Sequence, residues 1–191
     1  MIIAIDLDDV LAASLEEFID FHNKNYGTKL KKEDFTAYYL TKIMDISRKE
    51  ENKRVDLFDK SKHSNNIKPI DGSQKAISNL SKKHKLIIVT SRPENLEKKT
   101  REWLLKHIPE IKEIYFIRKD YTGHKKTKAE VCKEIKADVV IEDNLHYALE
   151  CANAGIKVLL MDYPWNKTKK KNKLIIRVGS WEDILRKIDK V

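Results

Sequence analysis

Short apolar runs separated by amphipathic stretches constrain this chain more than any other feature of its sequence. Six runs have the length of buried strands, at residues 2–6, 85–90, 114–117, 138–142, 157–161 and 174–178. Stretches with helical periodicity lie between them, at residues 72–83, 95–107, 127–135, 144–154 and 181–187. Strands that are apolar on both faces and alternate with helices predict an α/β protein, with a parallel sheet covered by helices on both faces.

One segment interrupts this alternation. Between residues 13 and 68 no apolar run has the character of a strand, and residues such as Leu15, Phe18 and Ile19 recur at helical spacing. We therefore expect a small helical insertion after the first strand. Its aromatic side chains either form a core of their own or turn one or two rings toward a substrate. A proline and a glycine within residues 67–72 mark the return to the sheet.

The first predicted strand runs directly into three carboxylates, Asp6, Asp8 and Asp9. Asp6 and Asp8 lie on the same side if the strand continues, because side chains alternate along an extended chain. Carboxylates packed this closely need a cation or a shared proton. The carboxyl end of a parallel strand also faces the crevice where α/β sheets bind ligands. Capping of a following helix would explain one of these acids but not all three.

A second predicted strand ends in Glu142, Asp143 and Asn144. Acids at the ends of two separate strands are typical of a Mg²⁺ site, because this ion takes few protein carboxylates, several waters and a substrate phosphate. The alternative is a simple helix N-cap at Asp143 or Asn144.

Two further segments carry groups that can bind phosphate. The strand at residues 85–90 ends in Thr90, Ser91 and Arg92, and hydroxyls at a strand-to-helix turn can hold phosphate oxygens. Ser and Thr before a proline also suit an ordinary turn, and Arg92 either reaches a phosphate or base or forms a surface salt bridge. A lysine at a helix start opposes the helix dipole unless an anion lies beside it. Lys128 suits that position best, with Lys125 and Lys126 as competitors.

The charge balance is basic, with 39 Lys and Arg against 30 Asp and Glu and a net charge of +9. This excess suits a nucleic-acid partner, but lysine is spread over the whole chain, and the run from Lys167 to Lys173 is typical of a solvated loop. A positive field also attracts a small anionic substrate. Two cysteines cannot form a disulfide framework, and no apolar run is long enough to span a membrane, so we expect a cytoplasmic protein.

These pieces, in this order, resemble the haloacid dehalogenase superfamily of phosphohydrolases. Its four motifs match Asp6 to Val10, Leu86 to Thr90, Lys128, and Glu142 with Asp143. The runs DLDDVLA, TSRP, IEDN and DYPWN are similar to the 5′(3′)-deoxyribonucleotidase-like branch. That branch usually has two aspartates where this chain has Glu142 and Asp143, and often a glycine where this chain has Asp9. The resemblance implies a Rossmann-like core of residues 1–12 and 69–191, with residues 13–68 as a helical cap.

The resemblance also implies phosphoester hydrolysis through an aspartyl-phosphate. Asp6 would attack phosphorus, and Asp8 would protonate the leaving alcohol and then deprotonate water. For its first task Asp8 must hold a proton, which neighbouring carboxylates favour. Mg²⁺ would be bound by Asp6, the Asp8 carbonyl and Asp143. The remaining candidates would bind the phosphoryl group (Thr90, Ser91 and Lys128) or contact substrate or support the metal ligands (Glu142, Arg92 and Asn144).

The expected substrate is a small phosphate monoester, first of all a nucleoside or deoxynucleoside 5′-monophosphate. Sugar phosphates and phosphoglycolate are alternatives within the same reaction class. A nucleic-acid-end phosphatase, or a nucleic-acid-binding protein that uses the basic surface, is the competing interpretation. Trp165 in the DYPWN run either lines the active-site cleft or packs against the core. The sequence does not fix the oligomeric state.

Overall fold

The computed structural model describes residues 1–121 and 123–190 and forms one sheet in the order β4-β3-β2-β1-β5-β6-β7. The strands are β1 (Ile2–Ile5), β2 (Lys85–Pro93), β3 (Glu113–Asp120), β4 (Gly123–His124), β5 (Val139–Glu142), β6 (Lys157–Met161) and β7 (Ile175–Val178). All neighbouring strands pair in parallel except β3 and β4. The chain moves from β1 to β2 on one side and later reaches β5 on the other, which makes the end of β1 the switch point of the sheet.

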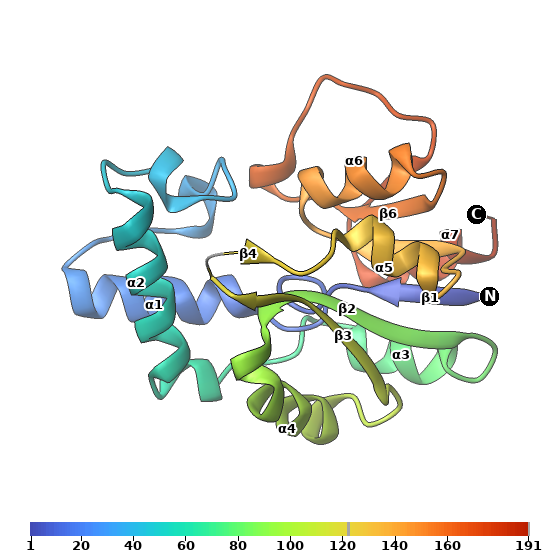
Figure 1. Ribbon diagram of the computed structural model, residues 1–191, viewed down its shortest axis with the longest axis horizontal. Helices are drawn as coiled ribbons and strands as arrows, with labels where there is room; N and C mark the ends of the chain where they lie inside the picture. Colours follow the sequence, from blue (N-terminus) through green and yellow to red (C-terminus); the bar gives the residue numbers. More distant parts are fainter. Residues whose placement is uncertain (122, 191) are drawn as a thin grey trace.

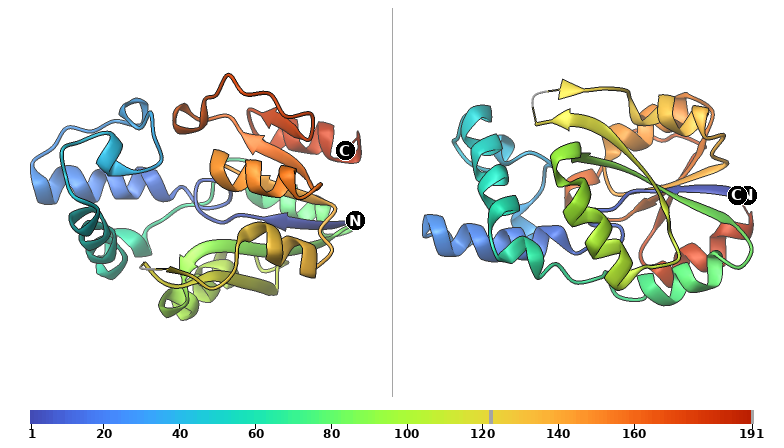
Figure 2. Two further views of the ribbon diagram at one scale, coloured as in Figure 1. Left: turned by 45° about the horizontal axis from the view of Figure 1, so that its top comes forward. Right: turned by 60° about the horizontal axis from the view of Figure 1, so that its bottom comes forward.

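Helices cover both faces of the sheet (Figures 1 and 2). One face packs against α3 (Ser73–Leu80), α4 (Glu97–His107) and α7 (Trp181–Lys187), and the other against α5 (Lys128–Glu134) and α6 (Leu145–Asn153). Strand β1 serves both layers because its side chains alternate: Ile3 and Ile5 join the first apolar cluster and Ala4 joins the second. The predicted α/β architecture is confirmed.

The segment between β1 and α3 is helical, as predicted. It contains α1 (Ser14–Tyr26), α2 (Arg48–Lys60) and three 3₁₀ turns at Lys32–Asp34, Leu40–Lys42 and His63–Asn65. Phe58 of α2 packs edge-on against Phe18 and Phe21 of α1, with ring centroids 5.4 and 5.6 Å apart. These rings pack together and continue the apolar cluster of the sheet, and two of them, Phe18 and Phe58, also line the cavity described below. The insertion lies beyond the carboxyl ends of the strands, at the left of Figure 1.

The sequence did not predict every boundary. Strand β2 continues to Pro93 and β3 to Asp120, so the carboxyl ends of both strands extend past the predicted ends toward the insertion. The two-residue strand β4, which pairs antiparallel with β3, was not predicted. It is too short to carry a period-2 pattern. Val191, the last residue of the predicted core range, lies outside the described residues. No helix in the described part of the chain is long and apolar enough to cross a membrane.

Candidate active site

The two acidic strand ends meet because β1 and β5 are neighbours in the sheet. The backbone N–H of Asp6 donates to the carbonyl of Ile141 at 2.9 Å, which aligns the residues that follow each strand. One carboxylate oxygen each of Asp6, Glu142 and Asp143 lies within 4.8 Å of the others, and all three residues are buried. The parallel register thus gathers acids that are more than 130 residues apart in the sequence.

Lys128, at the start of α5, also belongs to this acidic group. It is the first residue of α5, behind the Thr127 N-cap, and its fully buried Nζ donates to Asp6 Oδ1 and Glu142 Oε2 at 2.6 Å each. Lys125 and Lys126 instead pair with surface acids, Glu94 and Glu134 respectively. Of the three lysines that the sequence offered, only Lys128 is brought to the acids.

Glu142 is held by its surroundings on both oxygens. Oε2 accepts from Lys128, and Oε1 accepts from the backbone N–H groups of Asp143 and Asn144 at 3.2 and 2.9 Å. Asn144 caps α6, because its Oδ1 accepts from the His146 N–H at 2.8 Å. The N-cap alternative therefore applies to Asn144, while the Asp143 side chain stays with the acidic group.

The DYPWN run supports Asp143 from the far side. Trp165 Nε1 donates to Asp143 Oδ2 at 2.8 Å, and the Trp165 ring stacks on Tyr163 at a centroid distance of 4.3 Å. Buried Asn166 donates from Nδ2 to the carbonyls of Asp143 and Met161, at 2.6 Å each. Trp165 lines the cavity described below and also packs against the apolar core, so both roles left open by the sequence apply to it.

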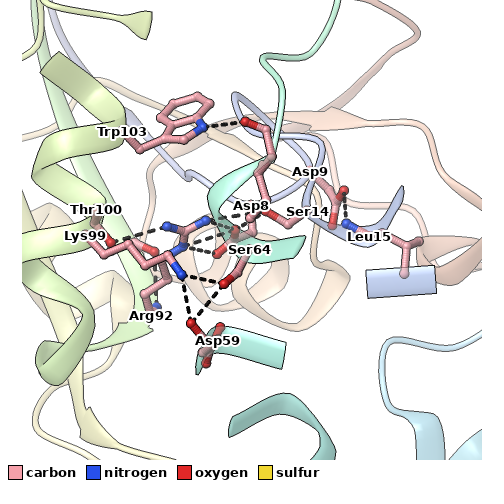
Figure 3. A network of polar contacts seen from close by, with 12 residues as sticks. Asp8, Asp9, Ser14, Leu15, Asp59, Ser64, Arg92, Lys99, Thr100 and Trp103 are labelled. Carbon is pink, nitrogen blue, oxygen red and sulfur yellow. Dashed lines mark hydrogen bonds and ion pairs between the residues drawn. The ribbon is translucent and has the colours of Figure 1, made fainter. Parts of the chain in front are cut away.

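Asp8 lies at the edge of the group in a tight ion pair with Arg92 (Figure 3). Arg92 donates from Nε at 2.9 Å and from an Nη at 2.6 Å, and the Ser14 hydroxyl also donates to Asp8. Burial alone would raise the pKa of Asp8, but the charge and hydrogen bonds of Arg92, with the Ser14 hydrogen bond, hold it below its usual value. The expectation that neighbouring carboxylates keep a proton on Asp8 is therefore wrong, since Arg92 outweighs them.

Asp9 has a different role from the other two acids of its run. Its backbone is left-handed, with φ of 56°, and its Oδ1 accepts from the Leu15 N–H at 3.1 Å near the start of α1. Asp tolerates this conformation better than most residues, and glycine tolerates it best. Asp9 thus binds one N–H in the first turn of α1 from outside the helix, although the N-cap residue itself is Ala13. The left-handed turn explains why glycine is common there in the family that the sequence resembles.

The hydroxyl candidates lie at the end of β2, next to β1 in the sheet. Thr90 is fully buried, and its Oγ1 accepts from the Arg92 N–H at 3.1 Å. That bond leaves the hydroxyl hydrogen of Thr90 free to donate. Ser91 is partly exposed and lines the same cavity as Asp8 and Asp143.

The charges of the acidic group do not balance. Asp6, Glu142 and Asp143 supply three carboxylates against the single ammonium of Lys128. Burial, against the pull of Lys128, raises the pKa of Asp6 to about 8, and burial with the charge of Glu142 raises the pKa of Asp143 well above its usual value. The oxygen ligands, their closeness and the missing positive charge fit a hard divalent cation such as Mg²⁺.

A cavity of about 260 Å³ opens beside this group, between the insertion and the sheet. The core contributes Asp8, Arg92 and Asp143 to its walls, and the insertion contributes Tyr38 and Asp59, among others. Tyr38 of the insertion and Asp143 of the core line the same cavity, so the insertion reaches toward the acids.

Asp59, Lys99 and Tyr121 also line this cavity, and sequence reasoning missed all three. They come from α2, α4 and the residue that follows β3, and only tertiary packing brings them together. No local motif in the sequence marks them.

A sequence model of the family described as 5′ nucleotidase, deoxy (pyrimidine), cytosolic type C protein matches residues 1–190. The chain belongs to this family. A nucleotidase of Clostridium acetobutylicum is 30% identical over 189 residues, which cover 99% of this chain and 94% of the relative. A 5′(3′)-deoxyribonucleotidase of Bacillus subtilis is 31% identical over 191 residues, which cover 98% of each.

Solved structures place this nucleotidase-family chain in the haloacid dehalogenase-like fold. A haloacid dehalogenase-like protein of Agrobacterium tumefaciens aligns with a TM-score of 0.71 at 17% identity, over 99% of this chain and 97% of the other. A haloacid dehalogenase-like hydrolase of Streptococcus pneumoniae aligns with a TM-score of 0.70 at 15% identity, over 98% and 97%. The predicted resemblance and the reaction class, a phosphoric monoester hydrolase of the nucleotidase branch, are confirmed.

Proposed function

We propose that this chain is a Mg²⁺-dependent phosphatase that hydrolyses a nucleoside or deoxynucleoside 5′-monophosphate through an aspartyl-phosphate on Asp6. The observation that carries the proposal is the buried convergence of Asp6, Lys128 and Asp143 at one end of the sheet, beside a cavity between the core and the insertion. The family match and the nucleotidase relatives support the choice of a nucleotide.

Asp6 is the proposed nucleophile. Lys128 bonds its Oδ1, which fixes the carboxylate and leaves Oδ2 for attack on phosphorus. The phosphoryl oxygens need a positive charge and a hydrogen-bond donor beside them. Lys128 would supply the charge, and the Thr90 hydroxyl would supply the donor. Ser91, on the cavity wall, would support the same oxygens.

Asp8 is the proposed acid and base. It lies on the cavity wall, where the leaving alcohol would depart, and its orientation is fixed by Arg92 and Ser14. For the first step Asp8 would take up a proton as the negatively charged phosphate enters and offsets the charge of Arg92, and it would then give that proton to the leaving oxygen. In the second step it would accept a proton from the water that attacks the phosphoaspartate. Arg92 acts in this proposal by positioning Asp8.

The carboxylates of Asp6 and Asp143, with the Asp8 carbonyl, would hold Mg²⁺. When bound, the ion would offset the excess negative charge and stabilise charge that develops on the phosphoryl oxygens. Glu142 and Asn144 would act indirectly: Glu142 fixes Lys128 and the turn at Asp143, and Asn144 caps the helix that follows.

The cavity favours a small ester over a nucleic-acid end, because its volume of about 260 Å³ is small and the insertion forms one of its walls. In this proposal residues 13–68 form the cap, and residues 1–12 with 69–191 form the catalytic core. A cytoplasmic location belongs to the same proposal, since nucleoside monophosphates are intracellular metabolites.

Phosphate release from a substrate panel tests the function. With Mg²⁺ present, we expect the highest kcat/KM for nucleoside or deoxynucleoside 5′-monophosphates, and lower values for sugar phosphates, phosphoglycolate and 5′-phosphorylated oligonucleotides. A clear preference for one of the other classes would redirect the substrate and leave the reaction class intact. Absence of turnover on every ester, including phenyl phosphate, would reject the proposed function.

A further inference from the structure

Asp59 places a carboxylate on the cavity wall, apart from the acids at the strand ends. It lies in the last turn of α2, and it lines the same cavity as Asp8 and Arg92. The Tyr121 hydroxyl donates to Oδ2 of Asp59. No other residue in the described part of the chain donates to the carboxylate, so Oδ1 is left as an acceptor beside the cavity.

Side chains of the core bind the backbone around Asp59 and leave its carboxylate Oδ1 without a contact to them (Figure 3). Lys99 of α4 donates from Nζ to the Asp59 carbonyl at 2.8 Å and to the Ser64 hydroxyl. One turn further along α4, Trp103 Nε1 donates to the Ile67 carbonyl at 2.8 Å. One face of α4 therefore fixes the returning segment of the insertion, and the Asp59 carboxylate is presented from a preorganised backbone.

The surroundings of Asp59 select the kind of group that it can receive. Burial raises the pKa of Asp59 to about 6, so the carboxylate is ionised at neutral pH and is a strong acceptor. The positive charges of Arg92 and Lys99 act on the same carboxylate, and they disfavour a cationic ligand group. A neutral O–H donor fits this position best.

The position along the cavity indicates which hydroxyl. Arg92 bonds Asp8, the proposed acid for the leaving group, and it is also within electrostatic reach of Asp59. We propose that Asp59 is a specificity-determining residue whose Oδ1 accepts a hydrogen bond from a hydroxyl of the leaving alcohol. This inference rests on the proposed function. In a nucleotide, the group concerned is a hydroxyl of the sugar, and Asp59 makes hydroxyl-bearing leaving groups preferred over hydroxyl-free ones.

Substrates that differ by one hydroxyl test the inference. Thymidine 5′-monophosphate, its 3′-deoxy analogue and phenyl phosphate are assayed with the wild type, Asp59→Ala and Asp59→Asn. A hydrogen bond to a charged group contributes about 10-fold or more, so we expect the wild type to lose at least about 10-fold in kcat/KM when the hydroxyl is removed. Asp59→Ala loses a similar factor on thymidine monophosphate only, and Asp59→Asn loses less because its amide oxygen still accepts.

The control variant is Asp56→Ala, one turn earlier on α2. Asp56 pairs with Lys60 and does not line the cavity, so Asp56→Ala should leave kcat/KM unchanged on all three substrates. An equal loss on all three substrates for Asp59→Ala, or a wild type indifferent to the hydroxyl, overturns the role of Asp59 while nucleotide hydrolysis stands. Hydrolysis of phenyl phosphate with neither nucleotide accepted overturns the nucleotide proposal and this inference together.

Discussion

Asp6 combines two demands at the residue scale, because it must be close to other acids and still present a reactive oxygen. Asp6→Asn keeps the shape and the Lys128 contact but removes the nucleophile. We expect turnover to fall by at least about 10³-fold, since covalent catalysis through Asp6 is lost. The melting temperature should be unchanged or slightly higher, because one of three crowded carboxylates becomes neutral. Phosphate release and a thermal melt measure both effects, and wild-type turnover in the variant would show that the nucleophile is another residue.

His22 gives a pH prediction that is independent of the catalytic site. It is fully buried in the insertion, with Nδ1 2.9 Å from the Thr28 hydroxyl and Nε2 2.9 Å from an Arg54 Nη. Burial and the Arg54 charge lower the pKa of His22 from 6.5 to about 4. Between pH 6.5 and pH 4, His22 is therefore protonated in the unfolded chain but stays neutral in the folded chain. Its contribution to the free energy of unfolding is lost as the pH falls through this range.

The size of this effect follows from linkage, at up to about 3 kcal/mol between those two pH values. Urea unfolding at pH 7 and pH 4.5 measures it. Relative to the wild type, His22→Gln should change the difference in unfolding free energy between the two pH values by up to about 3 kcal/mol in favour of the lower pH, whatever its own stability. The raised pKa values of Asp6, Asp59 and Asp143 add stability as the pH falls, and they do so in both proteins. His146→Gln, at an exposed histidine, should preserve the difference. An unchanged pH dependence in His22→Gln would assign the effect to other groups.

The site residues that could be predicted are marked by a local sequence pattern, and the others are brought to the site only by tertiary packing. Asp6, Asp8 and Asp143 follow strands directly, so local pattern and parallel pairing place them together. The choice of Lys128 over its two neighbours depends on which side of the α5 start faces the sheet, which a lysine-rich sequence does not reveal. Asp59 meets Tyr121 only after the insertion docks, and that docking leaves no local pattern.

At the scale of elements, the turn after β6 fixes the backbone of Asp143, one member of the acidic group. Asn166 bonds the carbonyls of Asp143 and Met161, and its Oδ1 accepts from Arg177 at 2.8 Å. Asn166→Ala leaves these buried groups unpaired, and we expect a loss of about 2–3 kcal/mol in the free energy of unfolding. The matched change Asn153→Ala, at an exposed helix end, should cost far less. Urea unfolding of both variants compares them, and equal losses would contradict the support assigned to this turn.

The same elements show where periodicity is informative. The central strands were predicted because both faces are buried and the runs are uniformly apolar. The ends of β2 and β3 carry polar residues that extend over the cavity, so their last residues have no strand pattern. The insertion was predicted as helical, but the 3₁₀ turns that shape its inner wall, such as Leu40–Lys42, are too short for a period to emerge.

At the scale of the whole molecule, the cavity belongs to neither the sheet nor the insertion alone. Arg92 bonds Asp8 and approaches Ser14 on the outgoing chain, while Lys99 bonds Asp59 and Ser64 on the returning chain. Both connections between the two parts are therefore fixed near the site (Figure 3). A ligand bound at the strand ends should for this reason stabilise the molecule as a unit.

Thermal melting with and without Mg²⁺ tests this stabilisation. The folded chain gathers three carboxylates within 4.8 Å, and the unfolded chain does not, so the ion should bind the folded state preferentially. Preferential binding stabilises by about 2.7 kcal/mol at a ligand concentration of 100 Kd. We expect the melting temperature to rise with Mg²⁺ and EDTA to abolish both this rise and turnover. Added Mg²⁺ in excess of the chelator should restore both.

Two controls separate a specific ion from general screening. NaCl at matched ionic strength should not reproduce the rise, because screening acts on exposed charges and these acids are buried. Asp143→Asn should lose the Mg²⁺-dependent rise while keeping a cooperative melt, since the neutral side chain can still accept from Trp165. Full turnover in a metal-free preparation, or a Mg²⁺ response that survives Asp143→Asn, would mean that the acids at the strand ends do not hold the ion. The excess negative charge would then have to be met by protons on the carboxylates themselves, consistent with the raised pKa values of Asp6 and Asp143.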